Sequence, residues 1–257
     1  MQVIYEDNHI IVVSKRSGEI VQGDKTGDEP LSETVKAYLK EKYQKPGNVF
    51  LGVVHRLDRP VSGLVVFART SKALTRLNKM FASGEVHKTY WAIVNLPPSP
   101  SVRRGGLDAQ SPQSHERLLA NQPPLRTEGD EGRLLTHWLT RNEQQNKSYA
   151  YDHEVPNAKK AQLRYRVIAC GERYQLLEVE LLTGRHHQIR CQLAAAGMPI
   201  RGDLKYGAPR SNPDGSISLL SRRVQFVHPV SGQEISLEAP LPDDPLWQKL
   251  YASLNDK

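Results

Sequence analysis

The chain has 257 residues, of which 38% are hydrophobic and 25% charged, values typical of a globular protein with a substantial core. Its net charge of +7 attracts polyanions without distinguishing RNA, DNA or lipid. Two cysteines make neither a disulfide framework nor a metal cluster, and no apolar run approaches the roughly 18 residues of a membrane helix. We therefore expect a reduced, cytoplasmic protein that is neither secreted nor inserted in a membrane.

The N-terminal part of the sequence alternates strand-like pieces with turns and one helix. VIY and IIVVSK predict strands, and LSETVKAYLKEKY at 31–43 has apolar side chains at helical spacing. The runs LGVV at 51–54 and LVVFA at 64–68 are short and β-branched, which predicts two buried strands. The nonamer HRLDRPVSG at 55–63 connects them.

The nonamer sets one carboxylate, Asp58, between Arg56 and Arg59. Side chains alternate in an extended chain, so Arg56 and Asp58 should point to the same side. A structural ion pair that closes the turn is one interpretation. The other is a carboxylate that neighbouring guanidinium groups keep ionised, so that it can act as a nucleophile.

A second helix and a strand follow this turn. Residues 70–84, TSKALTRLNKMFASG, begin with hydroxyl groups that can cap a helix and end on a glycine. HKTYWAIV at 87–94 alternates as a strand, with Lys88 and Tyr90 on the same face. Tyr90 is either a core aromatic residue or a surface on which a nucleobase can stack.

Residues 95–132 differ from the rest, because they hold six of the 17 prolines and have no apolar periodicity. This composition favours a flexible surface insertion over a second domain. Order resumes at 134–140, with further strands at 161–169 and 174–183, a helix from about 185 to 196, a strand EISLEAP and a short terminal helix. Strands with irregularly interspersed helices predict an α+β fold with a mixed or mostly antiparallel sheet.

TGRHHQIR at 183–190 follows a strand and opens the predicted helix, with Thr183 as a possible cap. Its basic side chains, Arg185, His186, His187 and Arg190, crowd the helix start, where free N–H groups favour an anion. A solvated basic face is one interpretation; phosphate recognition, or an arginine that pairs with a buried carboxylate, is the other. Zinc fits poorly, since adjacent histidines on a helix point about 100° apart.

Taken together, HRLDRPVSG, KTY and TGRHHQIR resemble the motifs of RluA-type pseudouridine synthases, in the same order and context. YEDNHIIVVSKRSG, GDLKYG and HPVSG extend the similarity over nearly the whole chain apart from 95–132. The resemblance implies a mixed, largely antiparallel sheet in two halves around a central cleft. It also implies an isomerase that converts uridine in RNA to pseudouridine, with no cofactor and no metal.

The resemblance also assigns roles within these motifs. The nucleophile falls on Asp58, the active-site tyrosine on Tyr90 and the basic partner of the aspartate on Arg190, while Arg56 helps to hold the flipped-out nucleotide. We expect further substrate contacts from Arg59, Lys88, Arg185 and His187. Two points stay open: whether Asp58 bonds the sugar or the base, and whether Tyr90 acts as a base or only stacks.

Three departures from the family pattern stand out. Arg16 replaces a proline, Val61 replaces a threonine, and LLSRRVQF lacks a leucine-histidine-alanine element. The replaced proline predicts a looser turn at KRSG. Relatives often carry an N-terminal RNA-binding domain, whereas this sequence begins directly with the catalytic motifs. We expect one catalytic domain over 1–257, a monomer, with the insertion at 95–132 as a candidate contact surface for rRNA or tRNA.

Two rival interpretations remain at this stage. One is a non-catalytic RNA-binding protein on the same fold. The other is a nucleoside or glycoside hydrolase, which would need a second carboxylate as acid or base, and Asp203 in GDLKYG is the candidate by motif context.

Overall fold

The computed structural model describes residues 1–24, 26–95 and 132–254, so most of the predicted insertion at 95–132 lies outside the described residues. A single mixed sheet runs through the molecule in the strand order β1-β2-β4-β10-β5-β9-β8-β6-β7, with β3 paired to β4 and β11 to β10. Within the described ranges, β4 with β10 is the one parallel pair, and the remaining pairs are antiparallel. The predicted α+β class with a largely antiparallel sheet is confirmed.

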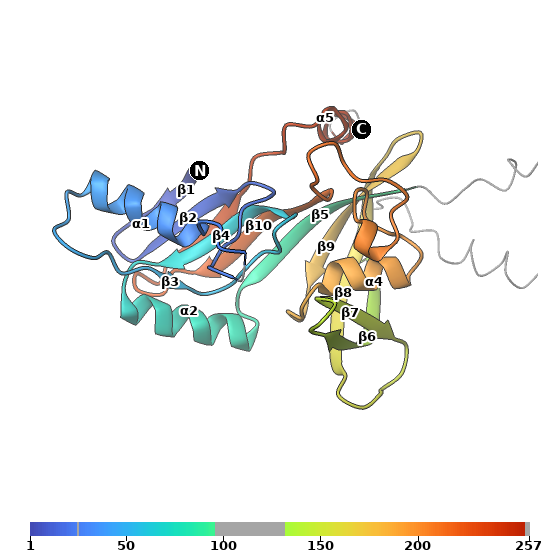
Figure 1. The fold of residues 1–257 in the computed structure, drawn as a ribbon, viewed down its shortest axis with the longest axis horizontal. Coiled ribbons are helices and arrows are strands. Elements are labelled where there is room, and N and C mark those ends of the chain that lie inside the picture. The colour runs from blue at the N-terminus through green and yellow to red at the C-terminus, as the bar shows by residue number, and fades with distance from the viewer. Residues whose placement is uncertain (25, 96–131, 255–257) are drawn as a thin grey trace, which may run out of the picture.

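The sheet divides into two halves joined by its long central strands (Figure 1). The first half holds the N-terminal strands, two helices and the last strands of the chain: β1 (Gln2–Glu6), β2 (Ile10–Lys15), α1 (Leu31–Lys42), β3 (Gly52–Val53), β4 (Ser62–Ala68), α2 (Ser71–Ser83), β10 (Leu219–Val227) and β11 (Glu234–Glu238). Strand β5 (His87–Asn95) connects it to the second half: β6 (Arg133–Asn142), β7 (Lys147–Tyr151), β8 (Lys159–Cys170), β9 (Tyr174–Leu181), α4 (Gln188–Ala195) and the 3-10 turn η2 (Leu204–Tyr206). Helix α5 (Pro245–Ala252) lies near the C-terminus.

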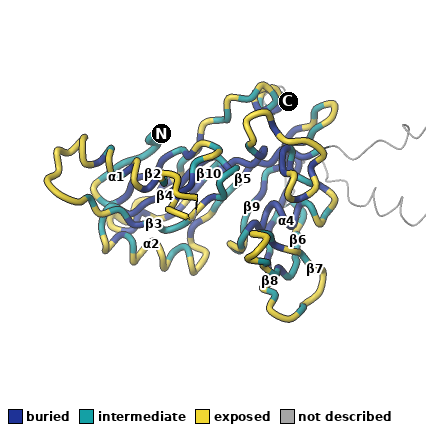
Figure 2. The backbone as a smooth tube through the Cα atoms, viewed as in Figure 1, coloured by how far each residue is buried: buried dark blue, intermediate teal, exposed yellow. Residues whose placement is uncertain are grey.

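Strand β2 is buried on both faces, which explains its continuous apolar run. Ile11 and Val13 pack into one core cluster with α1, while Ile10 and Val12 pack into another with α2. Successive side chains of a strand point to opposite faces, so the two helices cover opposite sides of this half. The tube in Figure 2 is accordingly buried along the central strands and exposed along the loops.

Both predicted helices of this half form as expected. Helix α1 turns Leu31, Val35 and Leu39 into the core, as the apolar spacing of its sequence predicts. Helix α2 begins after Thr70, whose hydroxyl accepts a hydrogen bond from the amide of Ala73, and it ends at Gly84 in the left-handed conformation.

The contact between β4 and β10 depends on Gly63. This residue has a φ of +115°, and a Cβ atom there would lie 2.6 Å from the backbone nitrogen of Ser221. Only glycine therefore lets the end of the nonamer approach β10 so closely. Because Ser221 is paired with Tyr90 on β5, this approach brings the nonamer beside the central strand.

Some sequence-based boundaries were wrong by a few residues. The strand predicted at 161–169 extends over Lys159–Cys170, and the one predicted at 174–183 ends at Leu181. The helix predicted from about residue 185 begins at Gln188. Strand β7 was missed, because its sequence KSYAY has few apolar residues.

Candidate active site

A cleft of about 880 Å³ opens where the two halves of the sheet meet. Its lining comes from residues 54–58 at the start of the nonamer, the end of α2 at 81–84, the central strand at Lys88 and Tyr90, and the segment 180–190 that leads into α4. The three motifs that were separate in the sequence therefore line one cavity.

Hydrogen bonds to its own backbone fix the nonamer at 55–63. The ammonium group of Lys15 donates to the carbonyl oxygens of Arg16, Arg59 and Val61 at 2.9, 3.0 and 2.7 Å. Only 1% of Lys15 is exposed, and this burial lowers its pKa to about 8. The amide of Gly18 also donates to the Arg59 carbonyl at 2.9 Å. The backbone around Asp58 is thus fixed by groups that lie outside the cleft.

The KRSG turn at 15–18, which the sequence predicts to be looser, is itself tied by hydrogen bonds. The amide of Arg16 donates to the Glu19 carboxylate at 2.8 Å, a bond that a proline in this place could not make. The hydroxyl of Ser17 donates to the carbonyl of Pro60 at 3.2 Å. These bonds anchor the turn to the nonamer.

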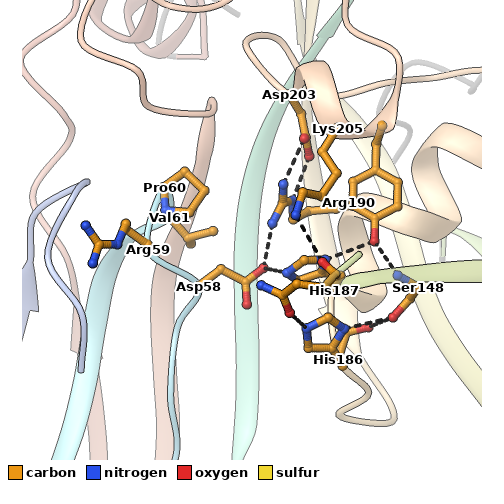
Figure 3. Close-up of polar contacts among 12 residues, drawn as sticks. Asp58, Arg59, Pro60, Val61, Ser148, His186, His187, Arg190, Asp203 and Lys205 are labelled. Carbon is orange, nitrogen blue, oxygen red and sulfur yellow. Dashed lines mark hydrogen bonds and ion pairs between the residues drawn. The ribbon is translucent and has the colours of Figure 1, made fainter. Parts of the chain in front are cut away.

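Arg190, buried in the second half, joins two carboxylates: the partly exposed Asp58 of the nonamer and the buried Asp203 (Figure 3). Its Nη1 donates to Asp58 Oδ2 at 3.0 Å, while Nε and Nη2 donate to the two oxygens of Asp203 at 2.7 and 2.8 Å. Burial alone would lower the pKa of Arg190, but the bonds to Asp203 and the attraction of both carboxylates raise it. The guanidinium is therefore a fixed positive charge beside Asp58.

His187 contacts the same carboxylate from the end of the loop before α4. Its Nε2 lies 3.4 Å from Asp58 Oδ2, and its Nδ1 lies 2.9 Å from the hydroxyl of Tyr206. Burial and the nearby positive charge of Arg190 lower the pKa of His187 to about 2, so its imidazole is neutral. His187 itself stands at the N-cap position with a φ of +51°.

The predicted cap at Thr183 is wrong for this helix. Its hydroxyl donates to the side-chain oxygen of Gln188 at 2.8 Å and accepts from the amide of Gln162 at 2.9 Å. The same oxygen of Gln188 accepts from the amide of Arg185 at 2.9 Å. The side chain of Gln188, the first residue of α4, thus holds the loop before the helix through these two hydrogen bonds.

Tyr90 lies on β5 within the cleft lining and is 7% exposed. Burial raises its pKa to about 12, against the opposing effect of a hydrogen bond with Ser221. Its phenol is therefore neutral at ordinary pH. The neighbouring Lys88 lies with its ammonium 5.4 Å from the centre of the Phe81 ring, and burial lowers the pKa of this lysine too.

The family model for RNA pseudouridylate synthases matches residues 9–195 of this chain. The chain belongs to this family. It is 30% identical, over its whole length and 70% of the relative, to ribosomal large subunit pseudouridine synthase D of Xanthomonas campestris. It is 30% identical to the mitochondrial pseudouridylate synthase RPUSD4 of Xenopus tropicalis, over 94% of this chain and 77% of that protein.

Synthase C of Vibrio cholerae is 28% identical over 93% of this chain, which spans 65% of the length of that relative. The fold is also that of the solved structure named human RNA pseudouridylate synthase domain containing 4. It has a TM-score of 0.68 and 19% identity, and covers 99% of this chain and 93% of the other. The protein is thus an RNA pseudouridine synthase, an isomerase rather than a non-catalytic binder.

The residues predicted to contact the substrate lie in three different surroundings. Arg56 and Arg185 are exposed on the cleft lining, as is the partly exposed Lys88. His187 belongs to the lining too, but both of its ring nitrogens already face protein groups. Arg59 lies outside the lining and turns to Asp28, with a further bond to Thr26 at 2.8 Å.

The ion pair expected between Asp58 and a neighbour in the nonamer does not form. No hydrogen bond or ion pair connects Asp58 with Arg56 or Arg59 in the described part of the synthase. Asp58 pairs instead with Arg190, 132 residues away, as the family resemblance implies. The alternation of side chains fails here because residues 54–58 are not in a strand.

Sequence reasoning missed that Asp203 binds Arg190 and that Tyr206 binds His187 in this synthase. Asp203, the candidate second carboxylate of the hydrolase interpretation, is 1% exposed, is engaged by Arg190 and lies outside the cleft lining. The described residues hold no cluster of His, Cys, Asp and Glu that could bind a metal ion. Among the helices in the described ranges, none has the length and apolarity needed to span a bilayer.

Proposed function

We propose that Asp58 is the nucleophile with which this synthase isomerises uridine to pseudouridine. One observation carries the proposal: the carboxylate, 29% exposed at the cleft, bonds at 3.0 Å to a guanidinium that is almost wholly buried. The buried guanidinium holds the carboxylate by a charge-assisted hydrogen bond. Partial exposure leaves that carboxylate accessible to a nucleotide in the cleft.

The reaction requires such a group because the glycosidic bond is stable. The bond between C1′ and N1 breaks, a bond between C1′ and C5 forms, C5 releases its proton to solvent and N1 gains one, with no change in oxidation state. An ionised carboxylate promotes this exchange by bonding transiently to the nucleotide or by stabilising positive charge at the sugar. Arg190 holds the carboxylate of Asp58 in place in either case.

Tyr90 serves as a neutral surface and hydrogen-bonding group for the flipped base. Its pKa of about 12 makes the phenolate rare at neutral pH, which argues against a role as general base. Extrusion of a uridine from a stack costs a few kcal/mol, which stacking and phosphate contacts offset. Arg56, Lys88 and Arg185 provide the positive charge around the cleft for those phosphate contacts.

The substrate we propose is structured ribosomal RNA, transfer RNA or both. The relatives from Xanthomonas campestris and Vibrio cholerae are named as synthases of the ribosomal large subunit, which supports the first choice. The net charge of +7 fits salt-dependent attraction to an RNA backbone. We further propose that the synthase acts in the cytoplasm, as a monomer.

The test uses cells that lack this synthase, complemented with the wild type, Asp58→Asn or the control Asp243→Asn. Asp243 lies near α5 and lines no part of the cleft. Pseudouridines are mapped by carbodiimide modification across ribosomal and transfer RNA. We expect a defined set of sites to depend on the wild type and the control and to be absent with Asp58→Asn.

Two results would count against the proposal. If Asp58→Asn restores those sites, Asp58 is not the nucleophile. If cells without the synthase lose no pseudouridine, the proposed substrates are wrong.

A further inference from the structure

The described contacts of the Asp58 carboxylate fall on one of its two oxygens. Arg190 Nη1 lies 3.0 Å from Oδ2, and His187 Nε2 lies 3.4 Å from the same atom (Figure 3). Within the described part of the chain, no hydrogen bond or ion pair reaches Oδ1. The carboxylate is therefore held asymmetrically.

A chain of hydrogen bonds fixes which nitrogen of His187 carries the proton. The amide of Ser148 donates to the hydroxyl oxygen of Tyr206 at 2.9 Å, so the hydroxyl hydrogen is free to donate to His187 Nδ1, also at 2.9 Å. A neutral imidazole with an accepting Nδ1 bears its proton on Nε2. Nε2, the nitrogen that bears this proton, lies 3.4 Å from Asp58 Oδ2.

The surroundings of His187 suit this positioning role better than the phosphate contact expected from the sequence. Its side chain is 5% exposed, stacks on His186 with ring centres 3.8 Å apart and meets the edge of Tyr206. Lys205 and Arg141 add positive charge nearby, which keeps the imidazole neutral together with Arg190. A neutral, enclosed ring is a weak ligand for phosphate but a rigid donor.

We propose that His187 and Tyr206 are positioning residues that, with Arg190, hold Oδ2 of Asp58 so that Oδ1 is the oxygen that reacts with the nucleotide. This inference rests on the proposed role of Asp58 as the nucleophile. Oδ1 supplies the electron pair for a C–O bond and regains it when that bond breaks, so the carboxylate is unchanged after turnover. Rotation about the terminal carboxylate bond is soft, and the hydrogen bond from Arg190 together with the contact of His187 on the same oxygen restricts it.

The test compares two amide substitutions of the same histidine. The side-chain nitrogen of Gln reaches the position of Nε2, whereas that of Asn reaches only the position of Nδ1. His187→Gln therefore keeps a donor toward Asp58, and His187→Asn loses it. The backbone φ of +51° at this residue favours Asn over Gln, so a purely structural role would rank the two variants in the opposite order.

Turnover is measured as release of tritium from C5 of uridine in a transcript, under single-turnover conditions. We expect His187→Gln to lose less than about threefold in rate and His187→Asn to lose roughly 10- to 100-fold, with RNA affinity unchanged for both. Equal rates, or a faster Asn variant, would overturn the proposal.

Tyr206→Phe removes the hydroxyl that orients the ring and keeps the aromatic surface. We expect a rate loss of roughly tenfold in the wild-type background and little further loss in His187→Gln, because no imidazole tautomer remains to be set. Equal losses in both backgrounds would contradict the proposed chain of contacts from Tyr206 through His187 to Asp58.

Asp58→Asn separates this proposal from the proposed function. If Asp58→Asn is inactive while His187→Asn has a normal rate, the positioning role is wrong and the role of Asp58 as nucleophile stands. If Asp58→Asn is active, Asp58 is not the nucleophile.

Discussion

The two halves of the sheet fix their parts of the cleft by different means. In the first half, backbone contacts fix Asp58, because Lys15 and Gly18 bind carbonyl groups of the nonamer and leave the carboxylate partly exposed. In the second half, side chains fix one another, because Arg190 and His187 are buried among polar partners. The proposed nucleophile, which is partly exposed, thus depends on a backbone fixed by hydrogen bonds, and its charged partner depends on a buried network of side chains.

This difference predicts what each kind of substitution should do. Substitutions of the residues that bind the nonamer backbone should displace Asp58 with moderate effects on stability, since Arg190 and Asp203 remain paired in the interior. Changes in the second half should destabilise the protein as well, because removal of one buried charge leaves another unpaired. The following substitutions separate the two cases.

The largest effect is expected for Arg190→Met. Asp203 would remain buried without its guanidinium, which should lower the free energy of unfolding by about 3–5 kcal/mol and abolish turnover. Adding Asp203→Leu should recover most of the stability, measured by urea unfolding, but none of the activity. Recovery of turnover in the double variant would show that Arg190 acts only through the fold.

Gly63→Ala should have the next largest effect. Its Cβ would collide with the backbone of Ser221 at a positive φ, so we expect a loss of about 3 kcal/mol in the free energy of unfolding. Gly84→Ala is a matched control, since Gly84 also has a positive φ, of +79°, but nothing within 4 Å of the added atom. The control should lose only about 1 kcal/mol. Equal losses would mean that conformational strain, and not the close approach to β10, explains the need for glycine.

Lys15→Met should have the smallest effect on the fold and a clear effect on the rate. Without the two hydrogen bonds that Lys15 donates to its backbone the nonamer loosens, so we expect turnover to fall roughly tenfold with RNA affinity unchanged. A normal rate would show that the backbone beneath Asp58 is fixed without this lysine.

The same variant tests a pH dependence of stability. The pKa of Lys15 is about 8 in the folded protein and 10.5 in a free lysine side chain, so the unfolded state binds more protons between these values. Stability should therefore rise with pH across this window, by about 3 kcal/mol from this group. Urea unfolding at the two ends of the window should show that rise in the wild type relative to Lys15→Met; parallel curves would contradict it.

Local patterns in the sequence predict most of the fold, because the faces of α1, α2 and the central strands are set by residues close together in the chain. Local patterns do not predict the long-range polar contacts. Alternation favoured Arg56 as the partner of Asp58, and only the family resemblance pointed to Arg190, which comes from the other half of the sheet.

The loop before α4 shows why such contacts escape local reasoning. The hydroxyl of Thr183 is a good cap by composition, yet the side chain of Gln188 occupies it and also binds Arg185. The tyrosine of GDLKYG belongs to a recognised motif, but its bond to His187 joins two segments that are adjacent only after folding. Motifs therefore predicted which segments line the cleft, and the structure was needed for the contacts between them.

The central claim is tested most directly by single-turnover tritium release with purified Asp58→Asn and Asp203→Asn. Both variants replace a carboxylate that Arg190 binds, but only Asp58 lines the cleft. We predict that Asp58→Asn binds RNA with unchanged affinity and loses at least about 1000-fold in rate, while Asp203→Asn loses stability and keeps measurable turnover. A rate for Asp58→Asn within tenfold of the wild type would contradict the account.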